Sequence, residues 1–414
     1  MTSPPTTLGT GTRAARWARK HLFRTWLDSA LTIVFGGLAL YLIFRFVLFV
    51  FVNARWEIIQ VNLKLLMVGR WPSDQLMVMA VSVAVLGLWV GLIAGLVHRR
   101  QMRAGQSRLT AMTGGQRVVD LVRRFGLIIG TVLLLLALTN TNGPWLMAAT
   151  TVVASVVGRV IGGAAGTRVL PRWVARTGVL LLALVPFAIY VYLSRTLALA
   201  DWEGFFFNIT SAIAGIILCF PLGVLLALAR RSKLRLLQSL SILYIEFVRG
   251  SPLFVLLLMA NVSLEFFVPA SIAPSKVIRA IVVFTIFTGA YLAEIVRGGL
   301  QSVPRGQEEA AKSLGLSPTK QMGLIVLPQA LRNVIPAQIG QFISLFKDTT
   351  LAGLALGILD LLEGAKAITQ QPDFRGQGLI IETLVFVGFL FWVGSFTMSR
   401  ESQRLERKLG VGTR

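Results

Sequence analysis

The sequence predicts an all-α polytopic membrane protein with about ten transmembrane helices. Apolar residues make up 55% of the chain and charged residues only 14%, whereas soluble domains carry about 25% charged residues. The mean hydropathy is +0.73, and the charges cluster between apolar stretches of roughly 18–25 residues, long enough to cross a bilayer core. We expect these stretches to be helices, because a helix satisfies its own backbone hydrogen bonds in lipid.

The expected spans follow the points along the chain where apolar residues give way to charged ones. They are residues 27–52, 76–97, 125–141, 145–165, 177–194, 207–229, 238–262, 277–296, 333–357 and 379–398.

Basic residues set the expected orientation of these spans. The loops on one side contain 29 Lys and Arg residues, whereas the loops on the other side contain 7. Because cytoplasmic loops carry the excess of positive charge, both termini and every basic loop are predicted to be cytoplasmic. One span more or fewer would largely remove the imbalance. The chain is therefore predicted to cross the cell inner membrane, in contact with lipid, with both ends inside.

The same residues argue against several other classes of protein. A net charge of +23 would suit nucleic-acid binding if Lys and Arg shared one face of a soluble domain, but they lie at the ends of apolar runs. The single cysteine, Cys219, excludes an intrachain disulfide. His21 and His98 are far apart beside basic residues, so no metal site is predicted. The first apolar run, residues 27–51, is too long for the core of a cleavable signal peptide.

Polar residues divide the chain into two predicted parts. Residues 1–200 form a membrane extension of about five spans with few polar residues inside them. Residues 201–414 form five further spans and contain nearly all the unusual polar residues. Within the extension, a repeat of small residues suits close helix packing, namely Gly158, Gly162 and Gly166.

The longest cytoplasmic loop of the second part, residues 298–332, predicts two short helices. Glu308 to Leu314 contains strong helix formers, and Gly315 follows where a helix end commonly needs a left-handed residue. Pro318 suits the first position of the second helix, and Pro328 is expected to interrupt that helix. A helix–glycine–helix knob between two spans is a rigid lever suited to docking into another protein.

This loop resembles the EAA loop of ABC importer permeases. It matches the spacing EAA-x3-G-x9-I-x-LP in full, at Glu309, Ala310, Ala311, Gly315, Ile325, Leu327 and Pro328. Three flanking segments resemble signatures of polar-amino-acid permeases, namely Tyr244 to Leu253, Gly289 to Gly299 and Lys347 to Leu351. The N-terminal part, including Val68 to Pro72, is similar to the larger permease subunits of general L-amino-acid transporters.

The resemblance implies that residues 201–414 are a permease core and that residues 298–332, the coupling loop, dock into a cytoplasmic ABC ATPase and transmit its closure to the spans. Ala310 and Ala311 would let the ATPase approach closely, and Glu309 would offer it a charge. Alternatively, Glu309 only caps or pairs within its own helix. Further implied partners are a second permease subunit, either a sister chain or the chain itself, and an extracytoplasmic amino-acid-binding protein.

Energy is expected to come from a separate polypeptide. The phosphate-binding pattern G-x-x-x-x-G-K-[ST] does not occur in the sequence. Neither H-E-x-x-H nor G-x-S-x-G occurs, so no catalytic residue is predicted. This chain is therefore expected to bind no cofactor and to be no enzyme, while the partner ATPase would use ATP-Mg.

Charged residues within the predicted spans mark further candidate sites, because charge is costly in hydrocarbon. Glu246 and Arg249 lie three residues apart on one helical face and could pair with each other. Glu294 and Arg297 have the same spacing. Each pair could brace its span, and bracing is favoured for the second pair. Glu246, Arg249 and Glu294 remain candidates for a pathway or gating role.

The run from Lys347 to Thr350 interrupts an apolar stretch and is a candidate for lining the permeation pathway. Its members, Lys347, Asp348, Thr349 and Thr350, could complement the carboxylate and ammonium of an amino acid. Gating or helix bracing are the alternatives for this run.

Two other functions fit the sequence less well. A carrier driven by an ion gradient would favour an internal repeat with paired broken helices, and no such repeat is apparent. A multi-spanning membrane enzyme would need a catalytic constellation, and none is recognisable. The predicted function is therefore a permease subunit for amino acids, polar or broad in range.

Overall fold

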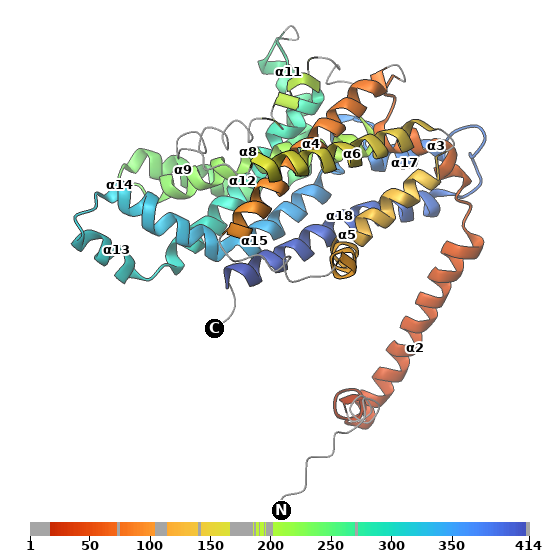
Figure 1. Cartoon of the computed structure of the whole chain (residues 1–414), viewed down its shortest axis with the longest axis horizontal. Coiled ribbons are helices and arrows are strands. Elements are labelled where there is room, and N and C mark those ends of the chain that lie inside the picture. Colours follow the sequence, from red (N-terminus) through yellow and green to blue (C-terminus); the bar gives the residue numbers. More distant parts are fainter. Residues whose placement is uncertain are drawn as a thin grey trace, which may run out of the picture. The chain divides into compact units, whose positions relative to one another are not determined.

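The computed structural model describes residues 17–72, 75–103, 114–139, 142–165, 202–269 and 272–410, with residues 185, 188–189, 191–193 and 195 between them. The described chain is helical, as predicted, and its β-type pairing is an isolated bridge between Gly204 and Asp360 (Figure 1). It forms two compact units, Met1–Trp56 and Glu57–Arg414. The boundary predicted near residue 200, between the membrane extension and the permease core, differs from this division into compact units and stays a prediction.

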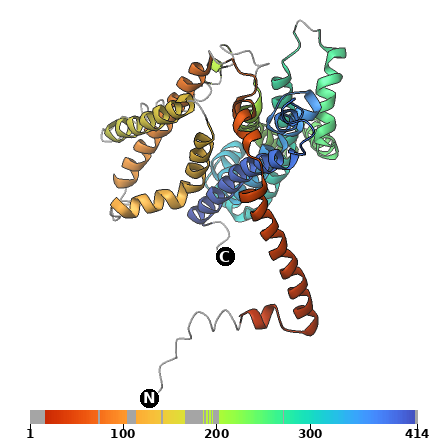
Figure 2. The same cartoon turned by 90° about the vertical axis from the view of Figure 1, so that its right-hand side faces the viewer.

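The first unit contains one long apolar helix, α2 (Trp26–Leu48), which continues into the π-helical turn η1 (Phe49–Asn53). The Thr25 hydroxyl caps the start of α2 by accepting a hydrogen bond from the Asp28 amide at 3.1 Å. Figure 2 shows α2 as one long helix, and Trp26–Asn53 is long and apolar enough to cross a membrane.

The second unit begins with α3 (Glu57–Val68), α4 (Leu76–Arg103), α5 (Gly114–Ala137) and α6 (Asn142–Ala165). Helices α4 and α6 pack through glycines on both sides. A Cβ on Gly91 would overlap the Ser155 carbonyl, and one on Gly158 would overlap the Leu88 carbonyl. The close packing predicted for Gly158 and its neighbours is thus present, although Gly166 lies outside the described residues.

The core of the second unit is built on α8 (Gly204–Arg230), α12 (Lys276–Ser302), α15 (Leu327–Asp348) and α18 (Ile380–Leu409). Helices α8 and α12 pack closely where a glycine of each faces a leucine of the other: a Cβ on Gly223 would stand 2.8 Å from the Leu292 Cβ, and one on Gly289 would stand 2.9 Å from a Leu222 Cδ. Aromatic rings of Phe205, Phe346 and Phe391 join α8, α15 and α18, with centroids 4.9–6.3 Å apart.

Six helices of the described chain are long and apolar enough to cross a membrane. They are Trp26–Asn53, Met77–Leu96, Asn142–Ala164, Gly204–Arg230, Lys276–Ser302 and Ile380–Arg407, and each coincides with a predicted span. Phe125–Ala137 is apolar but shorter, and the predicted span 177–194 lies almost wholly outside the described residues.

The prediction of one continuous helix over 238–262 is wrong. The segment forms α9 (Arg235–Gly250) and α10 (Leu253–Val262), which meet at 100°. Pro252 explains the break, because its ring disfavours a helical residue before it and it has no amide hydrogen to donate. Ser251 is accordingly extended, with ψ of 137°.

The predicted span 333–357 is also divided. Helix α15 ends at Asp348, and the short helix α16 (Leu351–Leu356) follows two residues later. The hydroxyls of Thr349 and Thr350 explain the end of α15. They donate to the carbonyls of Phe346 and Lys347 at 2.7 and 2.9 Å, competing with the helical bonds.

Two further helices were not predicted from the sequence. They are α3 and α17 (Leu361–Ile368), which pack against each other and against the start of α8. Both lie at the same end of the second unit in Figure 1. A third short helix, α11 (Leu264–Phe267), follows α10.

Candidate functional site

The candidate site residues lie at two opposite ends of the second unit. Helix α8 has 27 residues and is therefore about 40 Å long. The coupling loop lies at the end where α8 finishes, and helices α3 and α17 lie at the end where it begins (Figure 1).

The coupling loop forms the predicted pair of helices with a glycine elbow. Helix α13 (Arg305–Ser313) is followed by Gly315 in the left-handed region, with φ of 72°. Helix α14 (Pro318–Gln321) then begins with Pro318 at its first position, as predicted. A left-handed residue ends α13 and turns the chain, which explains why glycine suits this position.

The expected interruption at Pro328 is wrong, because the helix continues through it. The π-helical turn η5 (Met322–Val326) joins α14 to α15, and the Leu327 amide donates to the Met322 carbonyl five residues back. Pro328 has no amide hydrogen and would crowd a regular turn before it. The wider turn provides a physical reason why the helix passes the proline without ending.

Side chains of the EAA motif differ in what they face. Glu309 and Ala310 are exposed, whereas Ala311 is buried within the chain. Ala311 thus packs inward, and its burial prevents the close approach of a partner that was expected for it. Among the described residues, Glu309 has no ion pair, so its carboxylate stands free on the surface. Ile325 and Leu327 are half-buried and Pro328 is exposed.

The coupling loop is held to the helices beside it by polar contacts. Arg231, just after α8, forms an ion pair with Glu308 at 3.6 Å. The Asn333 amide of α15 donates to the Ser302 hydroxyl at the end of α12 at 3.0 Å. These contacts connect α13 to α8 and α12 to α15. A displacement of the coupling loop would therefore pull on α8, α12 and α15.

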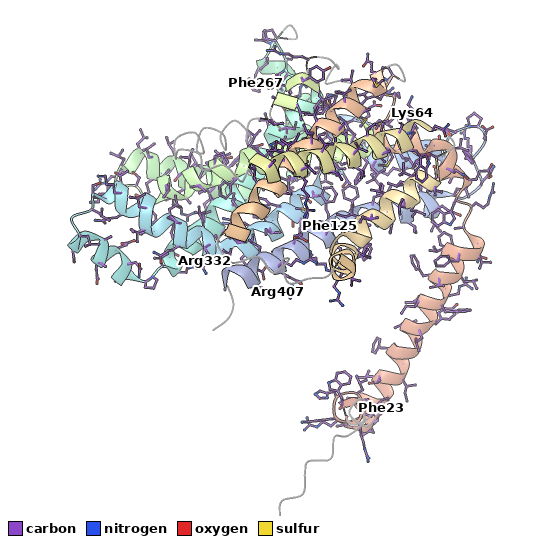
Figure 3. All side chains as sticks on the ribbon, viewed as in Figure 1. Phe23, Lys64, Phe125, Phe267, Arg332 and Arg407 are labelled. Atoms are coloured by element: carbon purple, nitrogen blue, oxygen red, sulfur yellow. The ribbon has the colours of Figure 1, made fainter. Side chains whose placement is uncertain are left out.

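Helix α15 is also joined to the C-terminal helix. The Arg332 guanidinium donates to the Leu409 carbonyl near the end of α18. Figure 3 labels Arg332 and, on α18, Arg407, and both lie toward the end of the unit that contains the coupling loop.

A cluster of ion pairs lies close to the coupling loop, centred on Glu294 of α12. Its carboxylate binds Arg230 of α8, Arg297 at 2.7 Å and Arg249 of α9 at 3.8 Å. The predicted pair of Glu294 and Arg297 is confirmed. The predicted pair of Glu246 and Arg249 is wrong, because Glu246 binds Arg230 at 3.3 Å.

The position of Arg249 explains why it pairs with Glu294 instead of Glu246. Arg249 lies over the Tyr291 ring, 5.4 Å from its centroid, and reaches Glu294 on the same helix α12. This contact between helices offers both a carboxylate and an aromatic face, whereas a pairing within α9 offers only the carboxylate. Glu246, Arg249 and Glu294 thus bind helices together at this end of the unit.

The residues from Lys347 to Thr350 face different surroundings. Lys347 is exposed and Asp348 and Thr350 are half-buried, whereas Thr349 is fully buried. The Thr349 hydroxyl accepts a hydrogen bond from the Asn208 amide at 3.1 Å. The four residues therefore do not form one surface, and a role in lining a pathway stays a prediction for those that are not buried.

Asn208 and Asp360 complete a buried polar cluster with Thr349. The Asn208 amide also donates to Asp360 at 3.2 Å, and its carbonyl accepts from the Leu361 amide at 3.1 Å. Asp360 caps α17 by accepting from the Glu363 amide at 2.9 Å. Burial raises the pKa of Asp360 to about 6, despite these hydrogen bonds. The cluster ties α8, the end of α15 and α17 together.

Next to this cluster lies an open recess of about 620 Å³. Its polar lining comes from Arg70 and from residues of α17 and its C-terminal turn, and its apolar lining from the segment before α17 and the start of α18. The residues that line it include Arg70, Ile358, Glu363, Lys366, Gln370 and Ile380.

Helix α3 is fastened beside this recess by two polar contacts. Glu203, just before α8, accepts from the Arg70 backbone amide at 2.9 Å and from its guanidinium. The Gln371 amide donates to Asn62 of α3 at 2.8 Å. Gly69 has φ of 65°, and a Cβ there would overlap Glu203, so only glycine allows this approach.

Sequence reasoning missed Asn208, Asp360, Glu203 and Arg70 as site residues. A weak signal existed for Asn208 and Asp360, since each is a polar residue near an apolar run. Their partnership joins positions more than 150 residues apart, which no local pattern indicates.

Comparison with known proteins identifies the second half of the chain. Residues 219–411 match the family described as binding-protein-dependent transport system inner membrane component. The inner membrane amino-acid ABC transporter permease YhdY of Escherichia coli is 42% identical over 212 residues, 51% of this chain and 57% of that protein.

Two further relatives match the same half. The glutamate/glutamine/aspartate/asparagine transport system permease BztC of Rhodobacter capsulatus is 42% identical over 50% of this chain and 48% of its own length. The probable glutamine ABC transporter permease GlnP of Bacillus subtilis is 34% identical over 50% of this chain and 91% of its own. The chain spans about half the length of YhdY and BztC. It belongs to the binding-protein-dependent transport system inner membrane components, among the amino-acid ABC transporter permeases.

Proposed function

We propose that this chain is the transmembrane permease subunit of an ABC importer that moves amino acids across the cell inner membrane. Transport is driven by ATP-Mg hydrolysis in a separate ATPase subunit that docks on the coupling loop. The observation that carries this proposal is the geometry of that loop, a two-helix knob with exposed Glu309 and Ala310 and a fixed glycine elbow.

The coupling loop has the connections needed to pass movement into the membrane. It continues through η5 into α15 as one helix, and it is tied to α8 by the ion pair of Arg231 and Glu308. Helix α15 in turn ends at Asp348, and the next residue, Thr349, belongs to the buried polar cluster. In this mechanism, closure of the ATPase shifts the knob, α15 carries the shift along its length, and the helices around the cluster separate.

The orientation in this proposal places the coupling loop and both termini in the cytoplasm. The 29 to 7 distribution of basic residues supports this orientation. The open recess is lined by Arg70 and by residues of α17, which lies at the opposite end of the unit from the loop, so in this orientation the recess faces away from the cytoplasm. An extracytoplasmic amino-acid-binding protein then delivers substrate at the recess end.

Polar or broad-range L-amino acids are the proposed substrates. The relatives support this choice, since the substrates named for BztC are glutamate, glutamine, aspartate and asparagine, and GlnP is named for glutamine. A second permease subunit, either a sister chain or a second copy, completes the proposed pathway.

Affinity purification of the chain from its native membrane in mild detergent tests the proposal. We expect an ABC ATPase to co-elute with the wild-type chain, as identified by mass spectrometry, and to be lost when Glu309 and Gly315 are both replaced. Replacing Lys347 instead provides a control outside the loop that should leave the ATPase bound. Recovery of the chain without an ATPase, under conditions that preserve a known transporter complex, would contradict the proposal.

A further inference from the structure

We propose that Arg70, together with Lys366, forms a binding site for the carboxylate of an amino acid in the recess beside α17. The inference rests on the proposed function for its choice of ligand class and for placing the recess outside the cytoplasm. It assigns to the N-terminal half of the chain a part in substrate recognition.

The size of the recess suits a small polar solute. Its volume of about 620 Å³ lies within the range of about 300–1,000 Å³ typical of small-molecule sites. Ile358 and Ile380 supply an apolar part of the lining, while Arg70, Glu363 and Lys366 supply charge. An apolar wall with a few charged groups is the usual composition of a site that orients a ligand.

Two of the three charged residues that line the recess are cations, Arg70 and Lys366, and the third is Glu363. Arg70 is paired with Glu203, but 77% of the arginine side chain is exposed and only 6% of the glutamate. Lys366 is paired with Glu363, and the exposed fractions are 44% for the lysine and 26% for the glutamate. In both pairs the cation is the more exposed partner, so the recess favours a carboxylate.

Arg70 is held in place before any ligand arrives. Glu203 accepts from both its backbone amide, at 2.9 Å, and its Nε, at 3.1 Å. The next residue, Trp71, is buried against Phe206 at a ring-centroid distance of 5.1 Å. Because the backbone and the base of the guanidinium are fixed, little side-chain freedom remains to be lost when a carboxylate binds.

Arg70 also comes from outside the family match, which begins at residue 219. The fastening of α3 through Asn62 and Glu203 places this residue of the N-terminal half on the recess of the permease core. The recess is thus a site to which both halves of the chain contribute.

Saturation-transfer difference NMR on the full-length chain in lipid nanodiscs tests the site. The probes are L-glutamine and 4-aminobutanamide, which is glutamine without its carboxylate. We expect L-glutamine to bind the wild-type chain and 4-aminobutanamide to give no comparable signal. Arg70→Gln should weaken L-glutamine binding about ten-fold, since a charge-assisted hydrogen bond to the carboxylate is lost.

Three variants separate ligand binding from a structural role of Arg70. Arg70→Lys keeps the charge and should retain most of the binding. Glu203→Gln weakens the fastening but leaves the arginine in the recess, so binding should persist. Arg375→Gln removes an exposed charge outside the recess lining and should have no effect.

Several results would overturn the inference. These are equal binding of the two probes, absence of L-glutamine binding to the wild type, unchanged binding by Arg70→Gln, or Arg70→Lys as weak as Arg70→Gln. If Arg70→Gln left L-glutamine binding unchanged but reduced the stimulation of ATP hydrolysis by the binding protein, Arg70 would bind a carboxylate of that protein instead of the amino acid. The NMR measurement uses neither ATPase nor binding protein, so a failure of ATP-driven transport would be a separate result.

Discussion

Gly315 is the residue at which the coupling loop turns between its two helices. Its φ of 72° lies in the left-handed region, where a residue with a Cβ is strained by about 1–2 kcal/mol. A Cβ at this position would meet no neighbouring atom, so strain of the backbone is the whole cost of a substitution. The requirement for glycine here is therefore conformational.

Replacing Gly315 with alanine should disturb the elbow and reduce the amount of ATPase recovered with the chain. Gly306→Ala is a matched control, because Gly306 lies in α13, has the same open surroundings and has no positive φ. The ratio of ATPase to permease after purification measures the effect. Equal losses in the two variants would show that the left-handed elbow has no special role.

Asp360 is a buried carboxyl group whose pKa, about 6, lies above the ordinary value of 3.8 because of burial. The folded protein therefore binds a proton at Asp360 more tightly than the unfolded chain does. Between pH 3.8 and 6, the folded state holds more protons, so the free energy of unfolding falls as pH rises through this window. Across this window, the shift in the pKa lowers the free energy of unfolding by about 3 kcal/mol.

Asp360→Asn should remove this contribution, because asparagine stays neutral and still caps α17. Thermal unfolding in detergent at pH 4 and pH 7 measures the difference between variant and wild type. We expect that difference to move in favour of the variant as pH rises. Asp373→Asn, at an exposed position in the following loop, serves as control, and identical pH profiles for the two variants would refute the assignment.

At the scale of elements, α4 and α6 are held together by glycines that let their backbones touch. The atoms that a new Cβ would meet are carbonyl oxygens of the other helix, which cannot move aside by changing a rotamer. Small residues permit such contacts in membranes, where packing rather than the hydrophobic effect brings helices together.

Gly91→Ala should therefore separate α4 from α6 and destabilise the chain by about 1–3 kcal/mol. Gly130→Ala is the control, since Gly130 lies in α5 and a Cβ there meets nothing. Thermal unfolding of both variants in the same detergent measures the effect. An unchanged unfolding temperature for Gly91→Ala would contradict the close packing described for this pair.

The cluster around Glu294 holds α8, α9 and α12 together near the coupling loop. One carboxylate with 15% of its side chain exposed binds three arginines, from all three helices. Glu246 binds one of these arginines, Arg230, but 58% of its side chain is exposed. Solvent therefore weakens the ion pair of Glu246 and Arg230 far more than the ion pairs of Glu294.

Glu294→Gln should destabilise the chain by about 3 kcal/mol, because it leaves arginines partly buried without their counter-charge. Glu246→Gln removes the same charge from the same cluster and should cost less than about 1 kcal/mol. Denaturation of the two variants in matched detergent compares them. A smaller loss for Glu294→Gln than for Glu246→Gln would exclude this account of the cluster.

For the whole molecule, the helical class and six of the apolar spans could be predicted from the sequence. Hydropathy is a sum over twenty neighbouring residues, so single exceptions do not obscure it. The elbow at Gly315 was also predictable, since helix formers, glycine and proline lie close together there. These features depend on local composition.

Features that depend on contacts between distant residues could not be predicted. Helix α3 was missed for a different reason, although its buried face, Ile58, Ile59, Asn62, Leu63 and Leu66, has helical spacing. That pattern was visible in the sequence, but a stretch of 12 residues is too short to stand out by hydropathy. The partners of Asn208 and Arg70 depend on the tertiary fold. The pairing of Arg249 with Glu294 instead of Glu246 depends on it as well.

The unit Glu57–Arg414 has the coupling loop at one end and the charged recess at the other, with long helices such as α8 and α15 between them. In the proposed function, an ATPase bound at the coupling loop drives amino acids through the chain. The movement passes from the coupling loop through η5 and α15 to the polar cluster at Thr349.

ATP-driven uptake in proteoliposomes tests this claim most directly. The chain is reconstituted with the ATPase, the second permease and the binding protein that co-purify with it, and accumulation of labelled L-glutamine is measured. We predict uptake that requires ATP and the binding protein and that is lost in the double variant of Glu309 and Gly315. Uptake by the chain alone, driven by an ion gradient and indifferent to ATP, would contradict the account.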